Sequence, residues 1–309
     1  MGEEQTKRNV AIGDEPVVLK EALSKPSIPA ITTTKNTTTN AASRWNTSKI
    51  GLRLGSDAIA AGAAGALVAP VITMIDKGIM ENASGRNTLG ESLKKSAKEM
   101  LGKPHRFLGS KPFVLIFSLY FGTYLTANTI DTIASARTNT PYTSTTAGTT
   151  KFLATSSSNL ALCLYKDNQF TQLFGASGSK RPVPLPTFAL FTLRDCLTIF
   201  ASFNLPPVFA PKIEAYMGDE VKKYVGAASV AQFVTPAAIQ FVSTPLHLLG
   251  LDLYNRPGAA MGGADGRVGQ VVKNWAKSAF ARIGRIIPAF GVGGVVNTKV
   301  RRGLMERLE

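Results

Sequence analysis

Ala58-Ile-Ala-Ala-Gly-Ala-Ala-Gly-Ala-Leu-Val-Ala-Pro-Val-Ile-Thr-Met-Ile75 is a run of 18 residues without a charged side chain. A helix of this length crosses the hydrocarbon core of a bilayer, which is about 30 Å thick. Two further runs, Phe113–Ile130 and Tyr224–Leu251, are uncharged over 18 and 28 residues. These three runs predict an integral membrane protein made of α-helices.

Three weaker apolar segments complete a set of six, and they are Phe152–Tyr165, Phe188–Phe203 and Ile286–Val296. Arg194 and Asp195 interrupt the second of these, and the third is long enough only if Arg282 and Arg285 are included. Charged side chains at membrane depth must face protein or water. The sequence therefore predicts six transmembrane helices with these charges turned inward.

A soluble all-α protein with unusually apolar core helices is the alternative, and a mean hydropathy of only +0.07 agrees with it. The low average, however, comes from the polar first fifty residues and from the connections between the segments. An uncharged run of 28 residues also exceeds the ordinary globular helix of about 10–14 residues. We therefore favour the membrane protein.

The first fifty residues are rich in Thr, Asn and Ser and have no apolar period, which predicts a disordered tail at residues 1–50. Its acidic residues are unlike a mitochondrial presequence, which is nearly free of acids. Three two-helix units follow, predicted at residues 51–138, 145–212 and 221–302. Residues 303–309 form a short C-terminal tail.

The net charge of +15 indicates an anionic partner. The basic residues do not gather in one domain with interleaved aromatics, so nucleic acid is not expected, and anionic lipid or a small anionic solute fits better. The connections after the first, third and fifth segments hold most of the positive charge. These connections therefore face the side that retains positive charge, with both termini opposite.

Cysteine and histidine are too few and too scattered for a reactive centre. Cys163 and Cys196 both lie in apolar segments, and His105 and His247 stand in no metal-ligand or catalytic-triad spacing. The sequence therefore predicts no metal, no cofactor and no enzyme activity.

The first, third and fifth segments each end in an acidic residue with a base close by. These pairs are Asp76 with Lys77, Lys166 with Asp167, and Asp252 with Arg256. A recurring two-helix unit predicts three pseudo-symmetric helix hairpins around a threefold axis.

Two motifs carry a family resemblance. The fourth segment contains Thr-Leu-Arg194-Asp195, and the sixth contains Arg282-Ile-Gly-Arg285-Ile-Ile-Pro. These stretches are similar to the T-L-x-R-D and R-x-x-R-x-x-P motifs of the mitochondrial carrier family, which the chain resembles over roughly residues 52–302. The resemblance implies a six-helix bundle around a central cavity, in a mitochondrial membrane and in the inner rather than the outer one.

The resemblance also implies site residues. It places Arg194 and Arg285 at substrate contact points, where guanidinium groups would hold a carboxylate or phosphate, and it makes the acid–base pairs above gate-like ion pairs. The full set of candidate contact residues is Arg194, Arg285, Asp195, Arg282, Asn128 and Asp131. The alternative is that the two arginines pair with Asp195 and Asp131 in a structural network.

Three functions remain open. The first is transport of a small anionic metabolite across the mitochondrial inner membrane. The second is a carrier-derived adaptor, or a protein insertion or import factor, of a mitochondrial membrane, which the missing proline-based gate signature of the carriers favours. The third is an unrelated six-span protein of another membrane.

Overall fold

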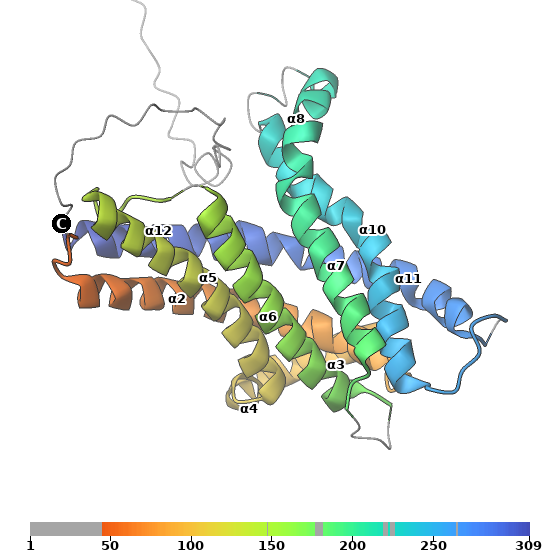
Figure 1. Cartoon of the computed structure of the whole chain (residues 1–309). Helices are drawn as coiled ribbons and strands as arrows, with labels where there is room; N and C mark the ends of the chain where they lie inside the picture. The colour runs from red at the N-terminus through yellow and green to blue at the C-terminus, as the bar shows by residue number, and fades with distance from the viewer. Residues whose placement is uncertain (1–44, 147, 177–181, 219–221, 223–225, 264) are drawn as a thin grey trace, which may run out of the picture.

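The computed structural model (Figure 1) describes residues 45–146, 148–176, 182–218, 222, 226–263 and 265–309. Most of the predicted N-terminal tail lies outside these described residues. Every regular element in the described part of the chain is a helix. In chain order these elements are α2 (Ile50–Ala83), α3 (Leu89–Gly102), α4 (Pro104–Leu108), α5 (Lys111–Thr138), α6 (Thr149–Phe174), α7 (Leu185–Phe203), α8 (Leu205–Tyr216), α10 (Ala227–Asn255), α11 (Arg267–Gly284), the π-helix η1 (Ile287–Gly293) and α12 (Gly294–Glu306).

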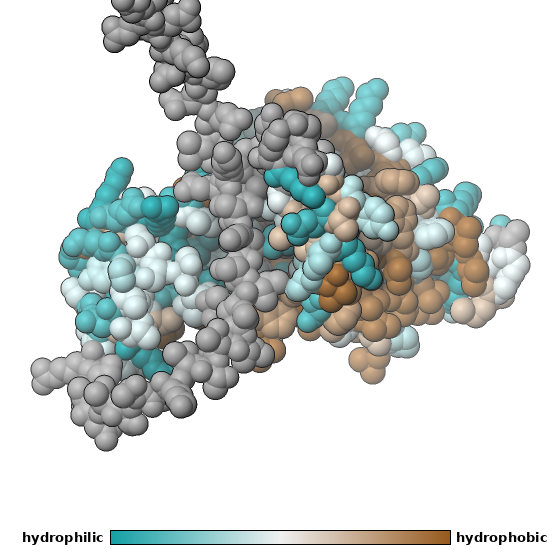
Figure 2. Space-filling view, turned by 90° about the horizontal axis from the view of Figure 1, so that it is seen from above, coloured by the Kyte–Doolittle hydropathy of each residue, from teal (hydrophilic) through white to brown (hydrophobic). Residues whose placement is uncertain are grey.

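Five of these helical stretches are long and apolar enough to cross a membrane: α2, α5, α7, α10 and the stretch Arg267–Glu306, which joins α11, η1 and α12. Much of their apolar surface faces outward, and the side chains of Leu67, Phe200 and Val242 are each at least half exposed. Seen from above, hydrophobic residues gather over the side of the molecule that contains α7 and α10 (Figure 2). An exposed apolar surface of this kind indicates contact with lipid, so the chain is an all-α membrane protein.

Six spans were predicted, but only five stretches of the described chain are long and apolar enough, because α6 does not reach the same apolarity. This helix contains the polar run Thr155-Ser-Ser-Ser-Asn159, which lowers its mean hydropathy. At 26 residues α6 is nevertheless as long as its neighbours.

The helices pack closely where glycine removes a side chain. A Cβ atom at Gly122 of α5 would lie 2.7 Å from Leu162 Cδ1 of α6, and one at Gly250 of α10 would lie 2.8 Å from Phe191 Cε1 of α7. Thus α6 packs on α5, and α7 packs on α10. The two helices of the predicted second hairpin, α6 and α7, diverge toward the end of the molecule that holds α8 (Figure 1).

Polar bonds join α2, α5 and α12 at the end of the molecule where the C-terminus lies (Figure 1). Arg301 Nε of α12 donates to Asp57 Oδ1 of α2 at 2.7 Å, and both side chains are buried. Asn128 of α5 and Asn297 of α12 exchange two side-chain hydrogen bonds of 2.8 and 2.9 Å. The first and last described transmembrane stretches therefore lie against each other.

The last stretch is interrupted in its middle. Pro288 has no backbone N–H to donate, and three glycines lie within the next six residues. The chain takes a π-helical turn there, after a break in the α-helix at Arg285. Turns of this kind are frequent at functional sites, and Arg285 lies directly before this one.

Candidate functional site

A cavity of about 330 Å³ lies between α5, α6, α7, α10 and η1. Its lining follows α7 from Arg194 to Phe203, a length of about 14 Å at 1.5 Å per residue. A volume of this size is at the lower end of the range for small-molecule sites. The cavity is therefore large enough for a single small solute.

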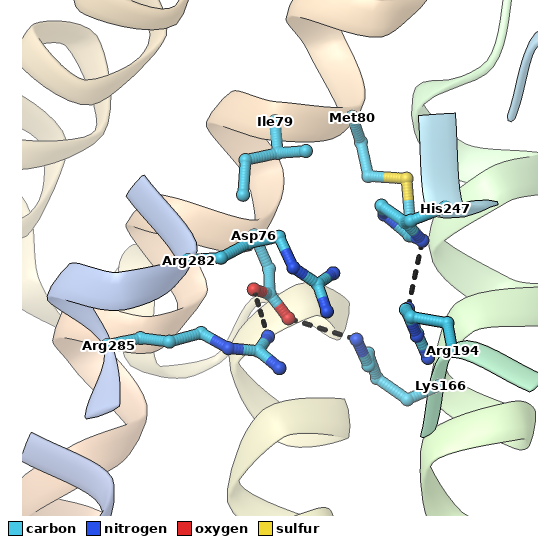
Figure 3. A pocket seen from close by; sticks show the side chains of 8 residues that line it. All are labelled: Asp76, Ile79, Met80, Lys166, Arg194, His247, Arg282 and Arg285. Atoms are coloured by element: carbon cyan, nitrogen blue, oxygen red, sulfur yellow. Dashed lines mark hydrogen bonds and ion pairs between the residues drawn. The ribbon is translucent and has the colours of Figure 1, made fainter. Parts of the chain in front are cut away.

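A buried group of charges closes the cavity at one end. Asp76 of α2 lies between two cations: its Oδ1 accepts from Arg285 Nη1 at 2.6 Å and its Oδ2 accepts from Lys166 Nζ at 2.9 Å (Figure 3). Three elements far apart in sequence, α2, α6 and the end of α11, thus meet at one carboxylate.

Arg194 of α7 continues the group toward α6 and α10. Its Nη2 donates to Asp167 at 2.6 Å and to Asp195 at 2.7 Å, and its Nη1 bonds His247 Nδ1 of α10 at 2.8 Å. Lys166 also forms an ion pair with Asp167. We call these eight residues the charge cluster: Asp76, Lys166, Asp167, Arg194, Asp195, His247, Arg282 and Arg285.

A second, much smaller space lies inside the charge cluster. Its free volume of about 10 Å³ holds roughly one water-sized group. We call it the chamber, and its lining residues are Asp76, Ile79, Met80, Lys166, Arg194, His247, Arg282 and Arg285 (Figure 3). Three of them, Lys166, Arg194 and Arg285, also line the cavity, so the two spaces adjoin.

The walls of the cavity are partly polar. Asn159 Oδ1 accepts from Thr123 Oγ1 at 3.4 Å, while its Nδ2 donates to no described residue. The buried hydroxyl of Thr155 has no hydrogen-bond partner in the described part of the chain. The Asn159 amide is therefore available to a polar solute, whereas the Thr155 hydroxyl is buried within the cavity wall.

Four of the six residues that the sequence predicted as substrate contacts lie together at this site. Arg194, Asp195 and Arg285 line the cavity, and Arg282 lines the chamber behind it. Arg194 does pair with Asp195, as the structural-network alternative expects, so it combines an internal ion pair with a position in the lining.

The other two predicted contact residues, Asn128 and Asp131, lie outside the lining of the cavity and the chamber. Asn128 is bonded to Asn297, and Asp131 pairs with Lys151 at 2.8 Å instead of with Arg285. Their role in substrate contact stays a prediction.

The predicted gate-like residues fall into two groups. Asp76, Lys166 and Asp167 join the charge cluster, but Lys77 lies 3.9 Å from the partly exposed Glu99. Away from the cluster, Asp252 pairs with Arg256 at 2.6 Å and with Arg267 at 2.8 Å, the latter at the start of α11.

Sequence reasoning missed Gln240 and Asn159 as functional candidates. Gln240 of α10 lines the cavity, and its Oε1 accepts from Arg282 Nε at 2.9 Å. Both residues could have been identified as amide side chains within predicted membrane-spanning helices, because such amides form hydrogen bonds in the interior of a helix bundle. Among the described residues, no group of His, Cys, Asp or Glu side chains could hold a metal ion.

Comparison with known proteins places the chain in a different family from the one its motifs suggest. Residues 60–305 match the family model described as Probable citrulline exporter. No curated protein matches the chain. The predicted membership of the mitochondrial carrier family is therefore wrong, and a mitochondrial location, which rested on it, has no support. The motifs misled because inward-facing arginines beside acids or prolines are short patterns that any helix bundle with a polar interior can contain.

Proposed function

The chain belongs to the family described as Probable citrulline exporter, and we propose that it transports citrulline, or a closely similar zwitterionic amino acid, across a membrane. Citrulline has an ammonium and a carboxylate at one end and an uncharged ureido group at the other. The observation that carries the proposal is a cavity whose closed end presents both signs of charge while its walls present uncharged polar groups.

The closed end suits the charged end of the solute. Asp195 uses Oδ2 for Arg194, while its Oδ1 accepts no hydrogen bond from a described residue. That oxygen is placed to accept from an ammonium group. Arg285, whose side chain is about a quarter exposed, lies on the same lining and can attract the carboxylate.

The walls suit the uncharged end. A ureido group has one carbonyl acceptor and several N–H donors. Asn159 Nδ2 can donate to the carbonyl, and the Ser156 hydroxyl can accept from an N–H group. A cavity wall of amides and hydroxyls thus binds a neutral polar side chain without requiring a counter-charge.

The proposal includes six membrane crossings. The Asp57–Arg301 ion pair holds the start of α2 against the end of α12, so both ends of the bundle emerge on one side. A chain with both ends on one side crosses an even number of times, and α6 supplies the sixth crossing. Its 26 residues span about 39 Å, and its polar residues Ser156 and Asn159 line the cavity, away from lipid.

Efflux from proteoliposomes tests the function. Vesicles that contain the purified protein and labelled citrulline should release the label faster than protein-free vesicles. Asn159→Leu should slow the release by about tenfold or more, because a hydrogen bond to the solute is lost and a bulky group enters the cavity. Asn168→Leu is the matched control on the same helix, since Asn168 does not line the cavity, and it should retain efflux.

Competition tests the solute. Arginine has a cationic guanidinium in place of the ureido group, and the charge cluster already holds four cations against three carboxylates. Unlabelled arginine should therefore compete with citrulline much more weakly than glutamine does. A well-folded protein that releases no amino acid would overturn the proposal and leave the non-transporting adaptor as the better account.

A further inference from the structure

The charge cluster is not neutral. Its cations are Lys166, Arg194, Arg282 and Arg285, and its carboxylates are those of Asp76, Asp167 and Asp195. Ion pairs join each carboxylate to at least one of Lys166, Arg194 and Arg285. One positive charge is left, and it belongs to Arg282.

Arg282 is buried without a counter-ion. It is 2% exposed, and within the described ranges no carboxylate forms an ion pair with it. Its one hydrogen bond runs from Nε to Gln240, which leaves both terminal nitrogens of the guanidinium without a described acceptor. Figure 3 shows this guanidinium pointing into the chamber, over Asp76. A buried and uncompensated charge is costly unless something pairs with it.

His247 adds a second donor. Arginine can only donate, so the contact between Arg194 Nη1 and His247 Nδ1 requires Nδ1 to be the acceptor. The hydrogen of the neutral ring is then on Nε2, which has no described partner. His247 lines the chamber together with Arg282, so the chamber has donors from α10 and α11 that the cluster itself does not use.

We propose that the chamber is a binding site for one oxygen-sized anionic atom, held by the Arg282 guanidinium and the His247 Nε2–H. The solute's carboxylate can supply this atom by placing one oxygen in the chamber and the other in the adjoining cavity; a small inorganic anion such as chloride is the second source. The first of these two alternatives, the solute's carboxylate, rests on the proposed function. It also assigns the solute's orientation, with its charged end toward α11 and its ureido group toward α6.

The size and position of the chamber agree with this assignment. A free volume of about 10 Å³ admits one atom of this kind and excludes a whole amino acid. Lys166, Arg194 and Arg285 line both the chamber and the cavity, so one carboxylate can reach from one space into the other. Because Gln240 lines the cavity and holds Arg282 Nε, it connects the solute space directly to the anion-binding group.

Thermal unfolding of the purified protein in gluconate buffer tests the site, since a ligand that binds the folded state raises its Tm. The additions are citrulline, citrulline amide, whose carboxylate is replaced by a neutral amide, and sodium chloride at constant ionic strength. The variants are Arg282→Gln and Arg53→Gln. Arg53 is also buried but is bonded to Thr132 and Ser135, far from the chamber, and controls for loss of a buried cation.

If the carboxylate is the occupant, citrulline raises the Tm and its amide does not. If an inorganic anion is the occupant, chloride raises the Tm without added amino acid. In either case Arg282→Gln raises the half-saturating concentration on the order of tenfold or more, while Arg53→Gln leaves it unchanged. Equal responses in wild type and Arg282→Gln, or a wild type that responds to neither citrulline nor chloride, overturn the inference.

Two further measurements separate the possible failures. Should Arg282→Gln not fold, Arg282→Lys keeps the charge but loses the planar pair of donors, and a weakened response is expected from it as well. Citrulline efflux is measured on the same preparations. An Arg282-dependent chloride response without efflux would retain the site and reject the proposed function. Efflux from a protein whose Tm responds equally in wild type and Arg282→Gln would retain the function and reject the site.

Discussion

Asp76 of α2 and Arg285 at the end of α11 form an ion pair of 2.6 Å across 209 residues of sequence. The same carboxylate accepts from Lys166 of α6, so it holds three separate elements together at the closed end of the cavity. Asp76 is buried, and its two oxygens have different partners. The stability of the bundle should therefore depend on this one side chain.

Replacing Asp76 by asparagine should cost about 3–5 kcal/mol, because Lys166 and Arg285 lose a counter-ion in a buried setting. Thermal unfolding in detergent measures the loss. Glu99→Gln is the control, since Glu99 lies 3.9 Å from Lys77 and is 40% exposed, and an exposed pair contributes about 0–1 kcal/mol. An Asp76→Asn protein as stable as the control would show that the cluster does not stabilise the fold.

The Asn128–Asn297 pair provides a second test of stability. Asn128→Ala leaves the buried amide of Asn297 without its partner, at a cost of about 1–3 kcal/mol. The double variant Asn128→Ala with Asn297→Ala should cost less than the two single variants together, because neither amide is then left unpaired. If Asn128 contacts the solute, as its sequence position suggested, the folded double variant should also lose citrulline efflux. Retained efflux would assign the pair to structure alone.

The helices could be predicted from the sequence because their signal is local. The uncharged run Tyr224–Leu251 lies largely within α10, and Phe113–Ile130 lies inside α5. The polar end of α6 was missed, since Phe152–Tyr165 stops at the first charge while the helix continues to Phe174. Charged residues end an apolar pattern, but they do not end a helix when they face a polar interior.

The partners of the charged residues could not be predicted in this way. Asp76 meets Lys166, which lies 90 residues further along the chain, while the adjacent Lys77 lies near Glu99. Such contacts depend on which helices are adjacent in space. Arg194 and Asp195 of α7 share the cavity lining with Gln240 of α10, and α7 packs on α10.

The two cysteines should differ in their reaction with charged thiol reagents. Cys163 of α6 lines the cavity, whereas Cys196 of α7 is exposed on the outer, apolar surface of its helix. In Cys196→Ser a water-soluble thiosulfonate should modify Cys163 and reduce efflux, and added citrulline should slow the modification. In Cys163→Ser the same reagent should have little effect, because lipid excludes it from Cys196. Labelling of Cys163 that citrulline does not change would place the solute elsewhere.

Asp195 should select solutes with a free ammonium group. Its Oδ1 is available in the cavity, and Arg194 keeps Asp167 as a partner when Asp195 is neutralised. Asp195→Asn should therefore fold, yet bind citrulline on the order of tenfold more weakly, since a charge-assisted hydrogen bond becomes a neutral one. N-acetylcitrulline, which has no ammonium, should inhibit wild-type efflux much more weakly than citrulline does. In Asp195→Asn the two compounds should inhibit about equally. Glu81→Gln, at another buried carboxylate outside the cavity lining, is the control. If wild type and Asp195→Asn discriminate equally between citrulline and N-acetylcitrulline, another group recognises the ammonium.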